Sequence, residues 1–478
     1  MRLRSLGLLI LAALPLAAHV GSPDVFFEGN AGPYRLLVTI RPPQVVPGVA
    51  EIEIRCASPD VREIRILPMR LGSSIPQFPP VADRALPSKE DPQFFTGNLW
   101  LMVAGSWQVQ IDADGSHGPG RLSVPVPALA TRILPMQKAI GVMLAVLGLI
   151  LAIGLVSIAG ASVREADLSP GRTPDRAHLR RSRIVMAASG VAVLGIVWLG
   201  NQWWASAAGD YQRFVFKPLQ LQTTVRDGNK LVVNLDDPGW LNRRTDDLLP
   251  DHGHLMHLYV IKQPDMDRVW HLHPERQPDG SFLQSLPSMP AGRYSLYGDI
   301  VHANGLPETA TASIDLPEIN GQPLTGDDAG GTGSRVAEAN YTSTVFPLPD
   351  GYRMAWERDA APLRAKKPYY FRFRLEDAQA RPAGSVELYM GMLGHAAFVN
   401  VDGSVFAHVH PSGSVPMPAV ALTQPDNPHA GHMMMAETLP AEVSFPYGFP
   451  KPGSYRIFVQ MKRAGAVVTG IFDAKVEN

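Results

Sequence analysis

Two long apolar runs constrain this chain more than any other feature. Residues 139–163 and residues 184–209 contain no charged side chain. About 20 apolar residues in a helix are enough to cross the hydrocarbon core of a bilayer, so each run is long enough. The sequence therefore predicts two transmembrane helices, with the remainder of the chain outside the lipid.

The segment between the two runs, residues 164–183, sets the expected orientation. Short loops that are rich in arginine stay in the cytoplasm. The charged residues of this loop are Arg164, Arg172, Arg176, Arg180, Arg181 and Arg183 against Glu165, Asp167 and Asp175. We therefore expect a protein of the bacterial inner (cytoplasmic) membrane, with residues 19–135 and 210–478 both on the extracytoplasmic side.

Residues 1–18 have the pattern of a secretory signal peptide. Two arginines precede an apolar stretch, and small residues at positions 17 and 18 offer a cleavage site. Cleavage there would make His19 the first residue of the mature chain. Its terminal amine and imidazole could together chelate one metal ion. An uncleaved anchor is the alternative.

Composition excludes two classes of function. The formal net charge of −1 argues against a nucleic-acid-binding surface, which needs a basic excess. Cys56 is the single cysteine, so neither an intramolecular disulfide nor a cysteine-based zinc site can form. We expect Cys56 to be a small core residue at the end of a strand.

The segments outside the apolar runs have the pattern of short strands. Residues 19–135 alternate apolar and polar side chains, and proline and glycine punctuate the gaps. Residues 210–317 and 341–478 predict two further β domains, joined by a flexible linker over residues 318–340. The expected fold is therefore mainly β, with three Ig-like β-sandwich segments plus two transmembrane α-helices.

The two C-terminal segments contain diverged copies of one unit. In the first copy, a strand at residues 253–260 is followed by a His-x-His-Pro motif at residues 271–274. In the second copy, a strand at residues 394–399 is followed by the same motif at residues 408–411. A proline-glycine-tyrosine element and a further strand come later in both. Such internal repetition predicts two domains of one architecture.

Six histidines occupy matching positions in the two copies. In the second copy, a two-residue turn at Asp402-Gly403 would place His395 opposite His410. Residues two apart in a strand share a face, so His408 would join them there. The sequence therefore predicts that these three imidazoles converge on one face of the sheet.

The first copy gives a similar arrangement if its hairpin is one residue longer. His257 would then oppose His273, with His271 on the same face. Three neutral imidazoles suit a zinc or copper ion, so each trio is a predicted metal site, and whether the two copies act together stays open. Strand histidines that only hydrogen-bond to backbone and water are the alternative.

A loop near the C-terminus adds a softer set of candidate ligands, His429, His432 and Met433. Thioether and imidazole together favour copper, because soft sulfur selects Cu(I). A loop with incidental methionines is the alternative. Weaker candidate ligands are His252, His254, Met256, His302, Met390 and Met392.

At these histidine motifs the chain resembles the YtkA-like and CopC-like β-sandwich domains of bacterial envelopes. The likeness rests on the glycine-histidine strand, the motif at residues 407–411 and the strand that begins at Gly453. It covers residues 250–317, 385–478 and, more loosely, 30–127. The resemblance implies CopC-like sandwiches and copper binding. In CopC-like proteins an N-terminal histidine contributes to Cu(II) binding, a role that His19 would fill.

Three functions remain open at this point. The first is a membrane-anchored, extracytoplasmic metal-binding protein for copper handling or delivery to an envelope partner, with a copper ion expected and zinc second. The second is a non-catalytic envelope scaffold with structural histidines. The third is an enzyme, which needs an open coordination position and a base such as Asp299 or Glu275. The sequence has no nucleophile elbow, phosphate loop or HExxH motif, so it favours the first two.

Overall fold

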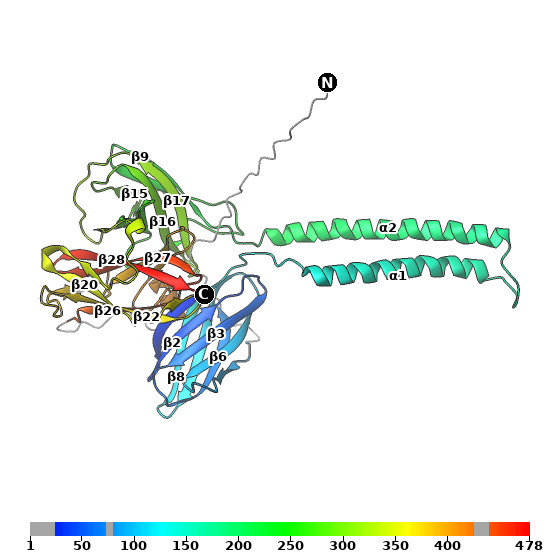
Figure 1. The fold of residues 1–478 in the computed structure, drawn as a ribbon, viewed down its shortest axis with the longest axis horizontal. Coiled ribbons are helices and arrows are strands. Elements are labelled where there is room, and N and C mark those ends of the chain that lie inside the picture. Colours follow the sequence, from blue (N-terminus) through cyan, green and yellow to red (C-terminus); the bar gives the residue numbers. More distant parts are fainter. Residues whose placement is uncertain (1–23, 73–79, 425–438) are drawn as a thin grey trace, which may run out of the picture. The chain divides into compact units, whose positions relative to one another are not determined.

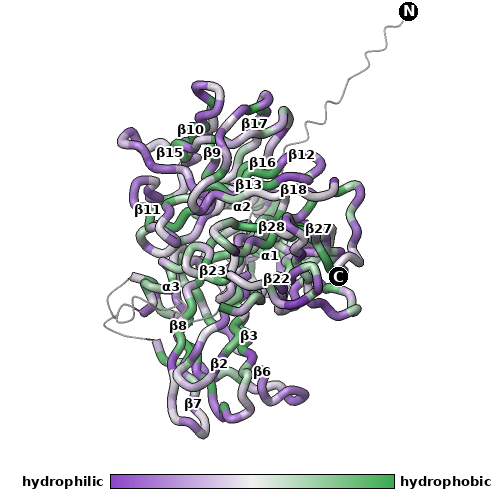
Figure 2. The backbone as a smooth tube through the Cα atoms, turned by 90° about the vertical axis from the view of Figure 1, so that its left-hand side faces the viewer, coloured by the Kyte–Doolittle hydropathy of each residue, from purple (hydrophilic) through white to green (hydrophobic). Residues whose placement is uncertain are grey.

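The computed structural model describes residues 24–72, 80–424 and 439–478, which are mainly β with two long helices (Figure 1). The chain divides into two compact units. One contains Met1–Leu129 with Lys217–Asn478, and the other contains Ala130–Phe216. Hydrophobic residues follow strands such as β3 and β28, while hydrophilic residues gather at the turns (Figure 2).

The first part of the larger unit is an eight-stranded sheet, in the order β1-β2-β3-β6-β5-β4-β7-β8. The expected alternation is clear in β3, where Ile52, Ile54 and Cys56 are buried and Arg55 is exposed. The strands are β1 Val25–Ala31, β2 Tyr34–Arg41, β3 Gly48–Cys56, β4 Val61–Arg70, β5 Asp83–Pro87, β6 Phe94–Leu101, β7 Gly105–Gly115 and β8 Gly118–Ala128. Cys56 is a buried strand-end residue, as predicted.

The smaller unit is a pair of helices, α1 Lys138–Glu165 and α2 Arg176–Gln212. Both are long and apolar enough to cross a membrane. The second helix begins earlier than the expected 184, because Asp175 caps it by accepting a hydrogen bond from the His178 amide. Four of the loop arginines therefore lie in the first turns of α2, and the connection between the helices is shorter than predicted.

The two helices approach closely at one small residue. The hydroxyl of Ser182 donates to the carbonyl of Gly160 over 2.8 Å. A Cβ atom at Gly160 would come within 2.3 Å of Met186 Cγ, so only glycine permits this approach. Small residues at helix contacts are typical of helices that associate within lipid.

The first repeat copy forms a ten-stranded sheet in the order β14-β15-β10-β9-β17-β16-β12-β13-β18, with β11 paired to β16. One contact, between β17 and β9, is parallel. The strands are β9 Gln220–Arg226, β10 Lys230–Asp236, β11 Leu248–Leu249, β12 His257–Gln263, β13 Arg268–Leu272, β14 Glu275–Arg276, β15 Phe282–Ser285, β16 Gly292–His302, β17 Pro307–Leu316 and β18 Ala329–Thr332.

The second copy contributes a six-stranded sheet, in the order β21-β28-β27-β24-β25 with β23 paired to β27, and a four-stranded sheet β19-β20-β22-β26. Phe373 and Phe472 are among the residues of the core that the two sheets share. The strands are β19 Val345–Pro347, β20 Arg353–Glu357, β21 Leu363–Arg364, β22 Tyr369–Glu376, β23 Val386–Glu387, β24 His395–Asn400, β25 Phe406–Val409, β26 Glu442–Tyr447, β27 Gly453–Arg463 and β28 Ala466–Glu477. The short helical segments are η1 Val336–Glu338, η2 Pro349–Gly351 and α3 Met417–Thr423.

The internal repeat predicted from the sequence is present in the topology. The order β17-β16-β12-β13 in the first copy matches β28-β27-β24-β25 in the second. The tyrosine of the proline-glycine-tyrosine element has the same role in both. Tyr294 Oη donates to the Pro290 carbonyl over 2.6 Å, and Tyr455 Oη donates to the Lys451 carbonyl over 2.8 Å.

The predicted hairpin registers are confirmed, but the predicted length of one turn is wrong. Ala397 pairs with His408, and Leu258 pairs with Leu272, as the expected pairings require. The turn after β24 is longer than Asp402-Gly403, since the Asn400 amide donates to the Val405 carbonyl. The loop therefore spans residues 401–404, and it preserves the register because it adds one residue on each side.

The stretch expected to be a flexible linker contains ordered structure at its centre. Strand β18 pairs with β13 along four residues, including His271 opposite Ala329. The preceding Asp328 accepts a hydrogen bond from the His273 amide over 2.9 Å. The glycines that suggested flexibility instead allow a close approach, because a Cβ at Gly331 would lie 2.8 Å from the Thr469 side chain.

Strands β12 and β24 are buried on both faces, which explains their nearly continuous apolar sequences. One face of each strand points into the core of its own copy, as Leu258 and Phe398 do. The other face packs against the opposite copy. Tyr259 of β12 and Val399 of β24 belong to one shared cluster. The two copies are thus joined by a common apolar layer.

A buried ion pair also links the copies. Arg456 on β27 has no exposed surface and makes two bonds to Asp473, at 2.9 and 3.1 Å. Its remaining nitrogen donates to the carbonyls of Met266 and Ser334 at 3.0 and 2.7 Å. The guanidinium therefore satisfies backbone groups of the first copy from within the second.

We predict that Arg456→Met lowers the free energy of unfolding by about 3–5 kcal/mol, because it leaves the Asp473 carboxylate buried without its partner. Urea denaturation of the full chain in detergent measures this change. Arg381→Met is the matched control, since Arg381 is 71% exposed in its pair with Asp377 and should change stability by less than about 1 kcal/mol. Equal effects of the two substitutions would contradict the prediction.

Candidate metal centre

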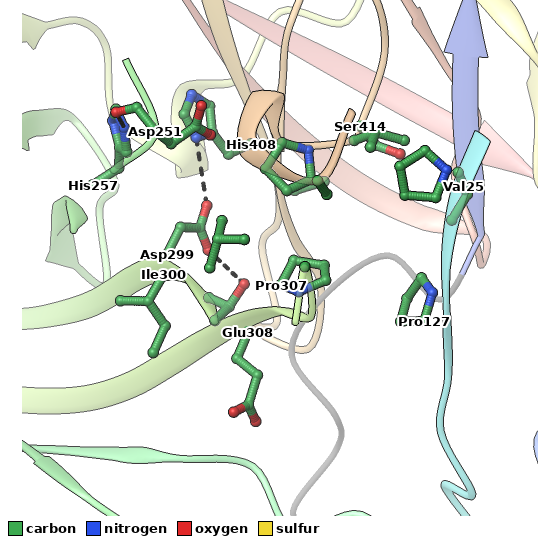
Figure 3. Close-up of a pocket in the computed structure, with 18 of the residues that line it drawn as sticks. Val25, Pro127, Asp251, His257, Asp299, Ile300, Pro307, Glu308, His408 and Ser414 are labelled. Atoms are coloured by element: carbon green, nitrogen blue, oxygen red, sulfur yellow. Dashed lines mark hydrogen bonds and ion pairs between the residues drawn. The ribbon is translucent and has the colours of Figure 1, made fainter. Parts of the chain in front are cut away.

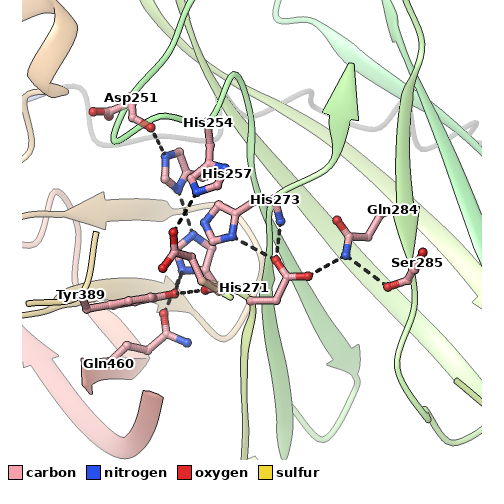
Figure 4. A network of polar contacts seen from close by, with 11 residues as sticks. Asp251, His254, His257, His271, His273, Gln284, Ser285, Tyr389 and Gln460 are labelled. Atoms are coloured by element: carbon pink, nitrogen blue, oxygen red, sulfur yellow. Dashed lines mark hydrogen bonds and ion pairs between the residues drawn. The ribbon is translucent and has the colours of Figure 1, made fainter. Parts of the chain in front are cut away.

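Eight histidines of the described residues converge where the two copies meet, beside the shared apolar layer. Neighbouring rings in this histidine cluster have centroids 4.1 to 6.4 Å apart. The first copy's side is shown in Figure 4. The members are His252, His254, His257, His271, His273, His395, His408 and His410.

The tight turns before β12 and β24 position the first histidine of each copy. Residues 251–254 and 389–392 each close with two reciprocal backbone hydrogen bonds. Positive φ angles at His252 (51°) and Met390 (51°), each followed by a glycine, make both turns possible. Nε2 of His257 lies 3.1 Å from the Asp251 carbonyl, and Nε2 of His395 lies 3.3 Å from the Tyr389 carbonyl.

Those carbonyls determine where the ring protons are. A carbonyl only accepts, so Nε2 of His257 and of His395 carries the proton, and Nδ1 of each ring carries a lone pair. These lone pairs point at the second histidine of each copy. His257 Nδ1 is 3.0 Å from His271 Nε2, and His395 Nδ1 is 3.2 Å from His408 Nε2.

The second histidine of the first copy also directs a lone pair inward. His271 Nδ1 lies 2.9 Å from Gln460 Oε1, whose amide nitrogen in turn donates to Thr469. Since that oxygen only accepts, Nδ1 of His271 is the donor and Nε2 is unprotonated. In the first copy, two nitrogen lone pairs therefore face one another at hydrogen-bond distance with no proton between them. In the second copy, His408 Nδ1 lies 3.5 Å from the Asp299 carboxylate.

The partners of His271 and His408 are exchanged between the copies. Asp299 is paired with His257 across the first copy's strands, and Gln460 is paired with His395 at the equivalent place in the second. Each reaches across to the other copy's second histidine, Asp299 to His408 and Gln460 to His271. Each ring's orientation thus depends on both copies being in place.

The third histidines present unpaired ring nitrogens. His273 Nδ1 lies 3.0 Å from Asp328 Oδ1, and His410 Nδ1 lies 3.4 Å from the Val415 carbonyl. Nε2 of both rings is buried without a hydrogen-bond partner among the described residues. Buried polar atoms are nearly always satisfied, so two such atoms at equivalent positions need an explanation such as a bound ion.

Two groups of three histidines have potential ligand atoms close enough together to hold one ion, and each group contains residues of both copies. One group is His257, His271 and His408, and the other is His252, His395 and His410, with one potential ligand atom of each member within 4.8 Å of the others in its group. The sequence predicted one trio within each copy, and the rings of each trio do lie together, with centroids 4.6 to 5.4 Å apart, but the groups with ligand atoms close enough for one ion draw on both copies. The copies pack face to face, so His408 completes a group with two residues of the first copy, and His252 completes a group with two of the second.

Burial keeps six histidines of the cluster neutral. Burial, followed by repulsion from neighbouring imidazoles, lowers the pKa of His257, His271, His395 and His408 well below the usual value. The same causes lower the pKa of His273 and of His410 to about 3. The imidazoles therefore offer lone pairs at neutral pH, which is the form that metals bind.

Two carboxyl groups lie beside the rings. Burial raises the pKa of Asp251 and of Asp299 to about 7. Asp299 also accepts a hydrogen bond of 2.5 Å from the Thr309 hydroxyl. Of the two bases considered from the sequence, Asp299 is thus at the cluster, whereas Glu275 is exposed on β14.

A cavity of about 140 Å³ adjoins the cluster (Figure 3). Asp251, His257 and His408 lie at one end, and Val25 and Pro127 of the first sheet lie at the other. Most of the remaining wall is apolar. It includes Ile300, Val301, Phe406, Val415, Pro416 and Ala419.

Several other candidates have different placements. His302 binds Asp247 and Glu308 at 3.1 and 2.8 Å, so it is an ion-paired residue outside the cluster. Met256 is in the core of the first copy. Met390 and Met392 are buried at the turn before β24. His19, His429, His432 and Met433 lie outside the described residues.

Sequence reasoning missed the residues that orient the rings. Gln460 and Asp328 were not singled out, and Tyr389, whose hydroxyl lies 3.3 Å from His271 Nδ1, was not either. Aligning the two copies could have identified one of them, because Gln460 in the second copy is equivalent to Asp299 in the first. Asp328 could not be found, since it belongs to the stretch interpreted as a linker.

We predict that the metal-free protein loses stability as the pH falls from about 6.5 towards 3. In this window the unfolded chain binds protons on histidines that stay neutral in the fold, so unfolding is favoured. Groups whose pKa is raised act in the opposite sense, but the six imidazoles outnumber these five, which are Asp24, Asp251, Asp299, Asp328 and His302. Urea midpoints of the chelator-treated chain between pH 8 and pH 4 test this, and a flat profile would contradict it.

A family model for a domain of unknown function, DUF8832, matches residues 344–478. No curated protein matches. Similar solved structures include the FN1–FN3 domains of chicken CNTN1 (9% identity, TM-score 0.14, covering 92% of this chain and 97% of that one).

Two further solved structures give the same result. A tetra-tandem repeat from the extending region of a large adhesion protein has 8% identity and a TM-score of 0.17, covering 96% of this chain and 93% of that one. A putative membrane anchored protein from Corynebacterium diphtheriae has 9% identity and a TM-score of 0.16, covering 95% and 96%. At such scores these structures indicate neither a ligand nor an activity for this chain.

Proposed function

We propose that this chain is a membrane-anchored, extracytoplasmic metal-binding protein that holds copper in the histidine cluster between its two repeat copies. Two apolar helices would anchor it, and three Ig-like β-sandwich segments would lie outside the membrane. One observation carries the proposal: in the first copy, His257 Nδ1 and His271 Nε2 face one another at 3.0 Å, while the other nitrogen of each ring lies beside a carbonyl or amide oxygen.

Such a contact is unfavourable unless a cation lies beside both nitrogens. Two nitrogen ligands at 2.0–2.1 Å in a tetrahedral site are roughly 3.3 Å apart, close to the spacing found here. Protonating one ring would also relieve the contact. However, the lowered pKa of His257 and of His271 opposes that at neutral pH. A metal ion therefore satisfies the geometry better than a proton does.

The arrangement favours two ions. His257, His271 and His408 would hold one, and His252, His395 and His410 would hold the other. Each ion would take ligands from both copies, so binding would clamp the copies together. Metal sites need outer partners that fix the metal-free nitrogen of each ligand ring, as Gln460 does for His271 and the Asp251 carbonyl does for His257.

Copper is the proposed metal, with zinc as the second candidate. The described donors are neutral imidazoles, which suit copper, zinc, iron and nickel. Among divalent ions copper binds nitrogen sites most strongly, so an imidazole-only cluster favours it over zinc. The proposed role is copper handling or delivery to an envelope partner, since a buried cluster suits holding an ion.

The first test is metal content and affinity of the full chain in detergent, after chelation and reloading with Cu(II) or Zn(II). We expect two ions per chain. His408→Ala should remove the first ion and His410→Ala the second, each with a loss above the roughly 10- to 100-fold caused by removing an outer partner. His117→Ala is the matched control, because His117 is 61% exposed in the first sheet.

The outcomes separate the competing functions. Stoichiometric binding that the control retains and the cluster variants lose supports the metal-binding proposal. Equally weak binding by the wild type, by His117→Ala and by the cluster variants would contradict it. The scaffold hypothesis, in which the histidines serve only the fold, would then stand.

The proposed orientation has its own test, because Cys56 is buried and leaves the chain free of reactive thiols among the described residues. Ser116→Cys and Ser169→Cys place one thiol on an exposed turn of the first sheet and one in the loop between the helices. A membrane-impermeant maleimide applied to spheroplasts should label Ser116→Cys at once and Ser169→Cys only after lysis. The reverse pattern would invert the topology.

A further inference from the structure

We infer that the cavity beside the histidine cluster admits a small, largely apolar molecule with one hydroxyl donor, of the size of phenol, to the ion held by His257, His271 and His408. This inference rests on the proposed metal function and extends it from storage of an ion to recognition of an external ligand. Three observations support it: the shape of the cavity, the position of the ligands and the polar group at its inner end.

The cavity has the size and lining of a ligand site. Its volume of about 140 Å³ is close to the ~150 Å³ of an engineered apolar cavity that binds benzene. Its walls come from several separate parts of the chain, including the first sheet, strands β16 and β25, and helix α3. Pockets that bind small molecules have this character, with apolar walls and a few polar groups that fix orientation.

The cavity ends at the metal ligands. His257 and His408 line it, whereas His271 does not and is instead held by Gln460 and Tyr389. Three protein ligands leave a fourth position of a tetrahedral ion unfilled, as in metal sites that bind substrates. With two of the three ligands on the cavity wall, that fourth position faces the cavity.

Asp299 supplies the polar group at the inner end. Its carboxylate lies between His408 Nδ1 and the Thr309 hydroxyl, and it lines the cavity (Figure 3). Carboxylate oxygens each accept more than one hydrogen bond, so Asp299 can also accept one from a ligand hydroxyl. A hydroxyl on an apolar ring therefore matches both the ion and the carboxylate, while the ring fills the apolar wall.

The experiment is a titration of the full chain in detergent with phenol, before and after loading with Cu(II). Ligand-observed NMR detects phenol binding to both forms, and the Cu(II) absorption spectrum detects phenol at the ion. Ala419→Leu fills the cavity from α3, where Ala419 is fully buried. Ala421→Leu is the matched control, because Ala421 is on the same helix but does not line the cavity.

We expect phenol to change the Cu(II) spectrum of the wild type and of Ala421→Leu, with at least a tenfold weaker effect in Ala419→Leu at unchanged copper content. If Ala419→Leu lowers the unfolding temperature, Val301→Leu replaces it as the test variant, because Val301 lines the same cavity from β16. If the chain takes up copper but its Cu(II) absorption spectrum does not change when phenol is added, this inference alone is overturned. Failure to take up copper at all would overturn the proposed function, and the inference with it.

Discussion

The packing of β12 and β13 against β24 and β25 is the constraint on which the rest of the structure depends. Each strand pair is buried on both faces, so one face must be covered by the other copy. Tyr259, Val399 and their neighbours form the apolar part of that contact, and the histidine cluster forms its polar end. Because water is excluded there, the imidazoles stay neutral and their lone pairs must be satisfied by the protein or by an ion.

The same packing explains why the candidate centre belongs to neither copy alone. Asp299 and Gln460 occupy equivalent positions, and each orients a ring of the opposite copy. The tight turns before β12 and β24 do the corresponding work within each copy, since their carbonyls fix the tautomer of His257 and His395. Metal binding, domain association and ring orientation are therefore coupled, and the cavity that reaches His257 and His408 connects this centre to the first sheet.

Much of the fold could be predicted from the sequence because the signals are local. The two apolar runs, the alternation in β3 and the repeated His-x-His motifs are each set by residues a few positions apart. Hairpin register was predictable for the same reason, and it survived an incorrect turn at residues 401–404 because the extra residues are shared between both strands. The early start of α2 and the strand β18 were missed, since a cap and an edge pairing override composition.

The sequence by itself determined that six histidines would lie at matching positions on two strand pairs, because side chains alternate along a strand with a period of two. It could not determine that His408 would join His257 and His271, or that His252 would join His395 and His410. These groups cross from one copy to the other, and no spacing along the chain encodes a contact between two separate sheets. Only the burial of both apolar faces against each other decided it, and that burial is a property of the assembled tertiary structure.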